Sequence, residues 1–90
     1  MNKTDLINTI AERSDLSRVE IESIVDEFLQ LIEDEVLKGK EVKLSNFGVF
    51  YKKARLARKG TNPSDGSPII IPANNTVGFR PSKILKEKLN

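Results

Sequence analysis

The basic charge of this chain is concentrated in its second half. Of its 90 residues, the first 50 hold 6 Lys and Arg against 11 Asp and Glu, and the rest hold 9 against 2, so a net charge of +2 combines a front half at −5 with a back half at +7. In the run from Lys52 to Lys59, the only residues that are not cationic are Ala54, Leu56 and Ala57, which is too little apolar surface for a core. We therefore predict that this run leaves the body of the protein as a charged arm suited to a polyanion.

The residue types that are absent narrow the possible functions. The chain has no Cys and no His, which removes disulfides, thiolate metal sites, the commonest metal ligand and the usual general base near neutral pH. No nucleophile has a base beside it and no glycine-rich phosphate loop follows a strand, so we expect no enzyme, metal, cofactor or small-molecule substrate. No apolar run reaches the length of a signal peptide or a membrane span, which predicts a cytoplasmic protein without a membrane partner.

Two helices are predicted in the acidic half. Asn2 can cap the first helix, which is expected to end near Arg13–Ser14. The sequence Ser17-Arg18-Val19-Glu20 matches a capping box, and it predicts the start of a second helix that runs to Lys38 with Gly39 as its stop.

The second predicted helix carries an apolar stripe that is wide for a chain of this size. Its apolar positions are Ile21, Ile24, Val25, Phe28, Leu29, Leu31, Ile32, Val36 and Leu37. One short helix and a small sheet can hardly cover this stripe, and a small domain buries a limited fraction of its surface. We therefore predict that a second copy of the chain covers it, which gives a homodimer; the alternative is that the stripe packs within one chain.

The rest of the chain has the pattern of a small sheet followed by a short helix. The predicted strands are 41–44, 47–51 with its continuation into the basic run, 69–71 and 76–79. The segment Asn62-Pro63-Ser64-Asp65-Gly66 has the residue types of a turn, and Pro81-Ser82 begins a C-terminal helix. The predicted order is helix, helix, strand, strand, arm, strand, helix, which places the chain in the α+β class.

Pro63 has two compatible interpretations at the apex of the arm. Its fixed φ suits a turn. Proteins that grip the minor groove of DNA also insert apolar side chains, Pro included, between base steps and so kink the duplex. Pro63 is therefore a candidate wedge as well as a turn former.

The sequence resembles the bacterial HU and integration host factor family of DNA-bending proteins, which are minor-groove architectural proteins. The match spans essentially all 90 residues, and the segments that carry it are Met1-Asn2-Lys3-Thr4, Asn46-Phe47-Gly48-Val49-Phe50, Ala57-Arg58-Lys59-Gly60-Thr61-Asn62-Pro63, Ile71-Pro72-Ala73, Phe79-Arg80-Pro81-Ser82-Lys83 and Leu85-Lys86. The resemblance implies an intertwined dimer with an α-helical base, a β-sheet saddle and two extended β-ribbon arms that wrap DNA, with Pro63 at each kink. It implies a single domain whose parts are 1–38 as the helical dimerisation base, 41–80 as the sheet with its arm at about 53–74, and 81–90 as the C-terminal helix.

The resemblance also implies which residues contact DNA. Cations of the arm line the minor groove, the Asn62-Pro63 pair forms the tip, and cations of the body touch phosphates on the flanks. The complete predicted DNA-binding set is Lys3, Arg18, Asn46, Lys52, Lys53, Arg55, Arg58, Lys59, Thr61, Asn62, Pro63, Arg80, Ser82, Lys83 and Lys86. The predicted aromatic core of the dimer is Phe28, Phe47, Phe50 and Phe79.

Two positions in the arm depart from the family pattern. Thr61 stands where the family commonly has Arg, and Lys53 stands where Arg is also common. Each neutralised phosphate contributes about −0.9 to the slope of log K against log salt, so the missing cation at position 61 predicts weaker binding with a flatter slope. Lys is also less suited than Arg to a narrow minor groove.

The predicted function is non-enzymatic, largely sequence-independent binding and bending of double-stranded DNA by a homodimer on the nucleoid. Two alternatives stay open: a site-preferring bender of the integration host factor kind, including a heterodimer, and a protein-interaction module whose basic arm binds an acidic partner. A sequence-reading helix-turn-helix is disfavoured because neither helix carries a base-reading cluster of Arg, Asn and Gln. A single-strand binder is disfavoured because Tyr51 is the only aromatic residue near the basic run.

Overall fold

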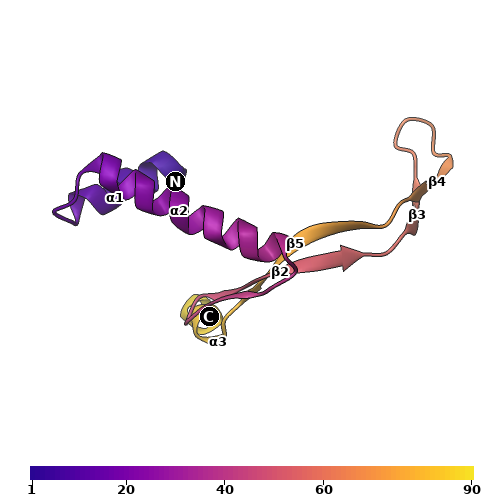
Figure 1. Ribbon diagram of the computed structural model, residues 1–90. Coiled ribbons are helices and arrows are strands. Elements are labelled where there is room, and N and C mark those ends of the chain that lie inside the picture. The colour runs from indigo at the N-terminus through magenta and orange to yellow at the C-terminus, as the bar shows by residue number, and fades with distance from the viewer. The chain divides into compact units, whose positions relative to one another are not determined.

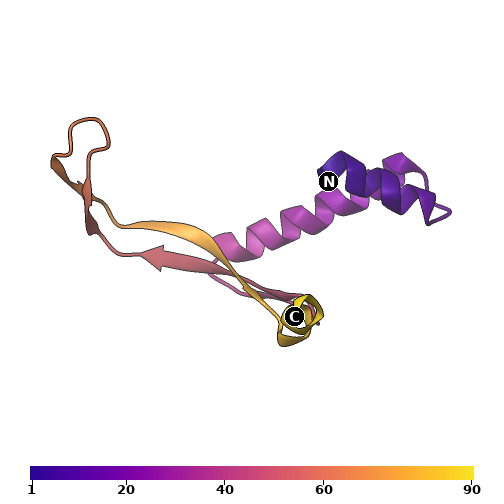
Figure 2. The ribbon, with the colours of Figure 1, turned by 180° about the vertical axis from the view of Figure 1, so that it is seen from behind.

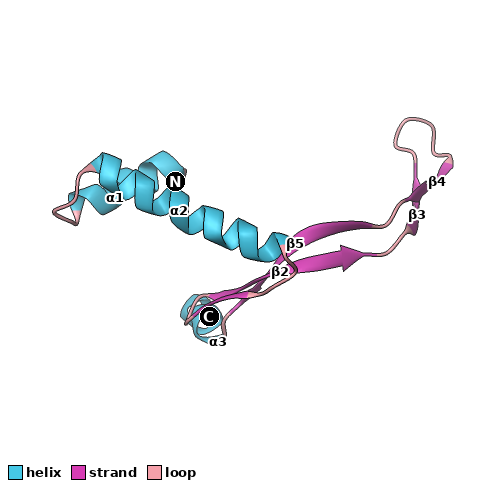
Figure 3. Cartoon of the chain, viewed as in Figure 1, coloured by secondary structure: helices cyan, strands magenta, loops and turns pink.

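The computed structural model describes residues 1–90 and divides into two units, Met1–Asp34 and Glu35–Asn90. The first unit holds α1 (Lys3–Glu12) and most of α2 (Arg18–Leu37), which are coloured from indigo to magenta in Figure 1. The second unit holds five strands and a C-terminal helix, which Figure 3 distinguishes by colour. This order of helices and strands confirms the predicted α+β class.

The N-terminus of α1 is closed by a reciprocal pair of hydrogen bonds. The backbone N–H of Asp5 donates to Asn2 Oδ1 at 2.9 Å, and the backbone N–H of Asn2 donates to Asp5 Oδ2 at 3.1 Å. The predicted Asn2 cap is therefore confirmed, and Asp5 completes a capping box that satisfies two otherwise free donors.

Both ends of α2 follow from short-range sequence signals. At its start, the N–H of Glu20 donates to Ser17 Oγ at 3.2 Å, which is the Ser17 half of the predicted capping box. At its end, Gly39 has a φ of 79°, its N–H donates to the carbonyl of Val36 at 2.9 Å, and the N–H of Lys40 donates to the carbonyl of Glu35 at 3.0 Å. This pair of bonds is a Schellman motif, which requires the left-handed conformation that glycine adopts without strain.

Replacing Gly39 by Ala is expected to lower the free energy of unfolding by about 1 kcal/mol, because Ala resists the left-handed conformation. A Cβ at this position meets no atom within 4 Å, so the effect comes from backbone strain rather than from a clash. Gly39→Asn is the matched control and should lose less, since Asn tolerates a positive φ, as Asn46 does in this chain at 63°. Denaturant unfolding of the three proteins measures the difference, and equal losses in Ala and Asn would contradict the argument.

A three-stranded antiparallel sheet forms the body of the second unit, with the strand order β1-β2-β5. Asn46 turns the chain between β1 (Val42–Leu44) and β2 (Gly48–Arg55), and the N–H of Phe47 donates to the carbonyl of Leu44 at 3.0 Å. β2 pairs along its full length with β5 (Asn74–Pro81), and the two strands lie side by side in both ribbon views (Figure 1, Figure 2). The predicted strand at 76–79 is therefore longer by two residues at each end.

The arm is a ribbon in two pieces. Beyond β2 and β5, the chain pairs again as β3 (Arg58–Thr61) with β4 (Pro68–Ile71), which form a separate two-stranded sheet. The break between the two sheets falls at 56–57 on one strand and at 72–73 on the other. Pro72 explains the break on its strand because it has no N–H to donate to a ladder.

The C-terminal helix α3 (Lys83–Leu89) starts at Ser82, whose Oγ accepts from the N–H of Leu85 at 3.0 Å. The N–H of Ser82 also donates to the carbonyl of Phe47 at 2.8 Å, which ties the helix start to the β1–β2 turn. On this helix, Ile84 is 44% exposed and Leu89 is 81% exposed. One chain lacks the apolar surface that would cover them.

Burial in the single chain is slight. Ile7 and Ile21, both in the first unit, are its only buried hydrophobic side chains. In the second unit, Phe79 packs against Phe47 and Phe50 with ring centroids 5.4 and 4.8 Å apart, so three of the four predicted core aromatics meet. Phe28 lies on α2 and is 49% exposed.

Candidate nucleic-acid interface

The register of β2 and β5 sorts the ribbon side chains onto two faces. Directly paired residues share a face, and faces alternate along each strand. One face, here called the polar face, carries Val49, Tyr51, Lys53, Arg55, Asn74, Thr76, Gly78 and Arg80. The opposite face, here called the phenylalanine face, carries Gly48, Phe50, Lys52, Ala54, Asn75, Val77, Phe79 and Pro81. Of the predicted DNA contacts on this ribbon, Lys53, Arg55 and Arg80 therefore share the polar face, and Lys52 lies on the other.

A hollow at the break in the arm brings three of the predicted cations together. Its lining residues are Lys53, Ala54, Arg55, Leu56, Arg58, Ile71, Pro72 and Asn74. The charges of Lys53, Arg55 and Arg58 thus converge from both ribbons, and all three side chains are exposed. No acidic residue lies among them, so an anion is the natural ligand of this hollow.

The two-stranded sheet of β3 and β4 is here called the outer ribbon. Arg58 and Lys59 lie on opposite faces of this ribbon. Arg58 pairs with Ile71, and its neighbour Lys59 pairs with Ile70. Gly60 leaves room for Ile71, because a Cβ at Gly60 would approach Ile71 Cδ1 to 2.9 Å. The outer ribbon therefore presents one cation on each face beside isoleucine side chains.

The tip of the arm is held by hydrogen bonds on both sides of Pro63. The N–H of Asn62 donates to the carbonyl of Ser67 at 2.8 Å, and Asn62 Oδ1 accepts from the N–H of Ser64 at 2.9 Å. The N–H of Gly66, which has a φ of 75°, donates back to the carbonyl of Asn62 at 2.8 Å. Pro63 is exposed and lies within this hydrogen-bonded turn, and the turn itself was predicted from the sequence.

Asp65 is the only carboxylate of the chain between Glu41 and Glu87. Hydrogen bonding by the Ser67 side chain and backbone N–H lowers the pKa of Asp65, and that N–H lies 2.8 Å from Asp65 Oδ1. Asp65 therefore closes the tip turn while placing one negative charge near the arm cations.

A second hollow gathers predicted residues of the body. It is lined by Lys43, Leu44, Ser45, Gly48, Val49, Phe79, Arg80, Pro81, Ser82 and Lys86. Arg80, Ser82 and Lys86 were predicted from the sequence, whereas Lys43 was not. Lys43 adds a third cation, so this hollow also suits a phosphate group. Asn46, also a predicted DNA contact, does not line this hollow; it forms the turn that precedes β2.

Several predicted DNA-binding cations already pair with carboxylates of the same chain. Arg80 Nη2 lies 3.2 Å from Glu41 Oε1, and Lys83 Nζ lies 3.9 Å from Glu87 Oε1. In the first unit, Lys3 pairs with Asp26, and the side-chain hydrogen bond to Asp26 raises the pKa of Lys3. Such exposed pairs are weak in water, so a DNA phosphate can compete for each cation.

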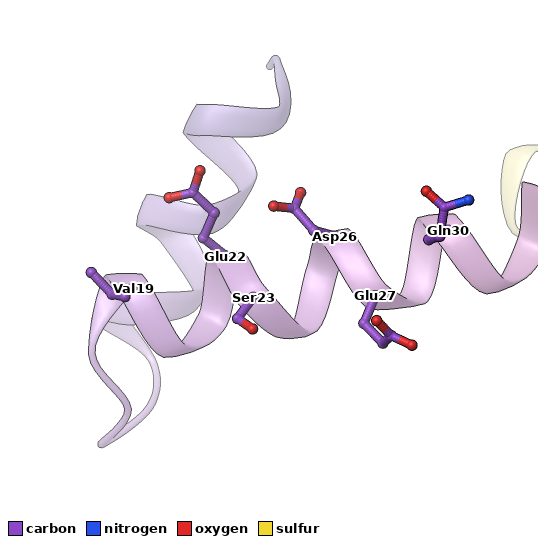
Figure 4. Close-up of a pocket in the computed structure, with 6 residues that line it drawn as sticks. All are labelled: Val19, Glu22, Ser23, Asp26, Glu27 and Gln30. Carbon is purple, nitrogen blue, oxygen red and sulfur yellow. The ribbon is translucent and has the colours of Figure 1, made fainter.

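The first unit carries an acidic strip along α2. Figure 4 shows Glu22, Asp26 and Gln30 along one side of this helix, with Ser23 and Glu27 beside them. Apart from Lys3, the predicted DNA-binding residue of this unit is Arg18, the first residue of α2, which forms no ion pair. The acidic strip repels a polyanion, so the attractive surface of the chain is in the second unit.

Three residues that were not predicted as DNA contacts lie on the same surfaces as the predicted ones: Lys43, Tyr51 and Thr76. Lys43 is on the exposed side of β1, and the alternation Glu41-Val42-Lys43-Leu44 was a usable signal for that position. Tyr51 and Thr76 lie on the polar face, but their roles depend on the pairing of β2 with β5, which no local pattern specifies.

The structure holds no group of His, Cys, Asp or Glu side chains arranged to hold a metal ion. No helix combines the length and apolar character that a membrane span requires.

Comparison with known proteins gives one family over the whole chain. The family model described as bacterial DNA-binding protein matches residues 1–90. The DNA-binding protein HU of Staphylococcus aureus is 46% identical over 87 residues, which cover 97% of each chain. The DNA-binding protein HU 1 of Bacillus subtilis is 44% identical over 87 residues, which cover 97% of this chain and 95% of that one. An Anabaena HU–DNA cocrystal structure is similar with a TM-score of 0.91 and 31% identity, covering 99% of this chain and 97% of that one.

Proposed function

This chain belongs to the bacterial DNA-binding protein family, and we propose that it binds and bends double-stranded DNA with little sequence preference. The observation that carries the proposal is the convergence of Lys53, Arg55 and Arg58 at the hollow in the arm. A narrow ribbon with such a cluster can enter a DNA groove and neutralise phosphates on its walls. Pro63, exposed on the tip turn, is placed to act as the wedge.

Little sequence preference follows from the kinds of contact that are available. The predicted contacts are mainly Lys and Arg side chains, which bind phosphates and respond to groove width rather than to base identity. No helix in the second unit presents the Arg, Asn and Gln cluster that reads base edges in the major groove. We therefore favour general DNA bending over the site-preferring alternative.

The proposed assembly is a homodimer. The exposed apolar residues are numerous on both units; they include Ile24 at 59%, Phe28 at 49%, Leu37 at 70%, Phe47 at 46% and Val77 at 58%. A chain of 90 residues with so little burial has insufficient hydrophobic stabilisation to remain folded alone. A second copy would cover these residues, and the predicted aromatic core would then include Phe28.

In this proposal the whole chain acts as one domain, with 1–38 as the dimerisation base, 41–80 as the sheet and its arm, and 81–90 as the closing helix. The remaining predicted contacts, including Lys59, Thr61 and Lys83, belong to the same DNA-binding surface. Charge and shape carry the function, so no catalytic step, cofactor or small-molecule substrate is assigned. The proposed site of action is the nucleoid.

End-to-end fluorescence transfer on a labelled duplex of about 35 base pairs tests the proposal directly. Bending brings the two ends together, so transfer should rise as protein is added at low salt and should fall again as salt is raised, because bound counterions compete for the phosphates. Light scattering on the same protein should give the mass of two chains. Binding without a rise in transfer would contradict bending, and absence of binding at low salt would contradict the DNA-binding assignment.

Replacing Thr61 by Arg is expected to strengthen binding and to steepen the salt dependence. One cation is gained per protomer, so the slope of log K against log salt should become more negative by about 1.8 for a dimer. The pairing of Thr61 with Pro68 places the new side chain next to the tip turn. Gln30→Arg adds the same charge on the acidic strip of α2 and should leave the slope nearly unchanged. An unaltered slope in Thr61→Arg would show that position 61 does not meet the DNA.

A further inference from the structure

Tyr51 and Gly78 form an unusual cross-strand pair on the polar face. They are directly opposite in the register of β2 and β5, and a Cβ at Gly78 would collide with Cζ and Cε2 of Tyr51. The tyrosine ring therefore lies across the glycine, and its position depends on the absence of a side chain there. This arrangement lets the aromatic ring lie close to the backbone of β5.

The guanidinium group of Arg80 lies on this ring. Arg80 Cζ is 4.6 Å from the centroid of Tyr51, which is within the range of a cation–π contact. Arg80 pairs with Val49, so it is the diagonal neighbour of Tyr51 on the same face. The stack fixes the plane of the guanidinium without using any of its N–H donors.

One N–H donor of Arg80 is bound to a carboxylate that a DNA phosphate can replace. Arg80 Nη2 donates to Glu41 Oε1 at 3.2 Å, and both side chains are about half exposed. An exposed pair of this kind contributes little stability in water. A phosphate oxygen can therefore take the place of Glu41 while the ring of Tyr51 continues to support the guanidinium.

We propose that Tyr51 is a positioning residue that holds the Arg80 guanidinium on the polar face in an orientation that binds a DNA phosphate. The proposal rests on the proposed DNA-binding function and adds a residue to that surface. Lys53 and Arg55 lie on the same face as Arg80, so a duplex that lies along this face can contact all three cations. Preorganisation of the guanidinium removes part of the ordering cost that a free side chain would incur on binding.

A double-mutant cycle on duplex affinity tests this role. Tyr51→Leu should weaken binding by about threefold for each protomer, so by about tenfold for a dimer, because the cation–π contact is lost. Tyr51→Phe keeps the ring and should bind within about twofold of wild type, since the aromatic face rather than the hydroxyl supports Arg80. In an Arg80→Ala background, Tyr51→Leu should cause no further loss, because there is no guanidinium left to position. A loss of equal size in both backgrounds would assign Tyr51 a purely structural role and overturn the proposal.

The wild-type protein offers a second measurement that does not depend on any variant folding. The chain has one Tyr and no Trp, so its intrinsic fluorescence reports on Tyr51 alone. Saturating DNA should reduce quenching of this emission by acrylamide, because a phosphate backbone held by Arg80 shields the ring. Unchanged quenching in a protein that demonstrably binds DNA would overturn the role of Tyr51 while leaving the proposed function intact. Failure of the wild type to bind the duplex would instead refute the proposed function itself.

Discussion

A protein in which Lys53, Arg55 and Arg58 are all replaced by Gln is expected to bind duplex DNA on the order of a thousandfold more weakly at about 0.1 M salt. The three side chains line one hollow at the break in the arm. A dimer would lose six cations, so the slope of log K against log salt should flatten by about 5. Titration of a labelled duplex at several salt concentrations measures both quantities. Folding should be little affected, because the three side chains are exposed and none pairs with a carboxylate.

The matched control removes the same charge elsewhere. Arg13, Lys38 and Lys40 are also exposed cations, and none belongs to the predicted DNA-binding set. Replacing these three by Gln changes the net charge by the same amount. It should therefore reproduce only the part of the affinity loss that comes from long-range electrostatic attraction. If the control lost as much affinity and slope as the arm variant, binding would depend on overall charge and the hollow would have no special role.

The helices and turns of this protein were predictable because their signals are local. Asn2, Ser17 and Gly39 each act through hydrogen bonds or a φ angle that involve residues within four positions. The same holds for the tip turn, where the sequence Asn62 to Gly66 specifies its own hydrogen bonds. Such elements form from short-range geometry, so tertiary contacts are not needed to predict them.

The surfaces of the arm were less predictable because they depend on strand pairing. The alternation of side chains along a strand separates Lys52 from Lys53, but the sequence alone does not place Arg80 on the face of Lys53. That placement comes from the pairing of β2 with β5, which joins residues that are 19 to 33 positions apart in the sequence. The stack of Arg80 on Tyr51 was missed for the same reason. Lys43, in contrast, was missed although the local alternation of β1 marks it as exposed. The ion pairs of Arg80 with Glu41 and of Lys3 with Asp26 are likewise long-range features.

Replacing Pro63 by Ala is expected to reduce DNA bending far more than DNA binding. A proline wedge opens a base step and kinks the duplex by tens of degrees, whereas affinity comes mainly from the cations, which the substitution leaves in place. The turn should persist in the variant because its hydrogen bonds join Asn62, Ser64, Gly66 and Ser67, none of which is changed. In the end-to-end transfer experiment, we expect the rise in transfer to fall by about half or more, with an affinity within about tenfold of wild type, since bending a short duplex costs about 1–6 kcal/mol and a less bent complex avoids part of that cost.

Pro68→Ala separates the wedge from a general effect of proline in the arm. Pro68 is the first residue of β4, pairs with Thr61 and is exposed, but it lies outside the tip turn. Both prolines stiffen the unfolded chain, so both substitutions change the conformational entropy in the same direction. In the proposed function only Pro63, on the exposed tip turn, enters a base step, so Pro68→Ala should retain nearly the full rise in transfer. Equal losses in the two variants would mean that arm stiffness determines the bend, and a full bend in Pro63→Ala would mean that the charged ribbons bend DNA without a wedge.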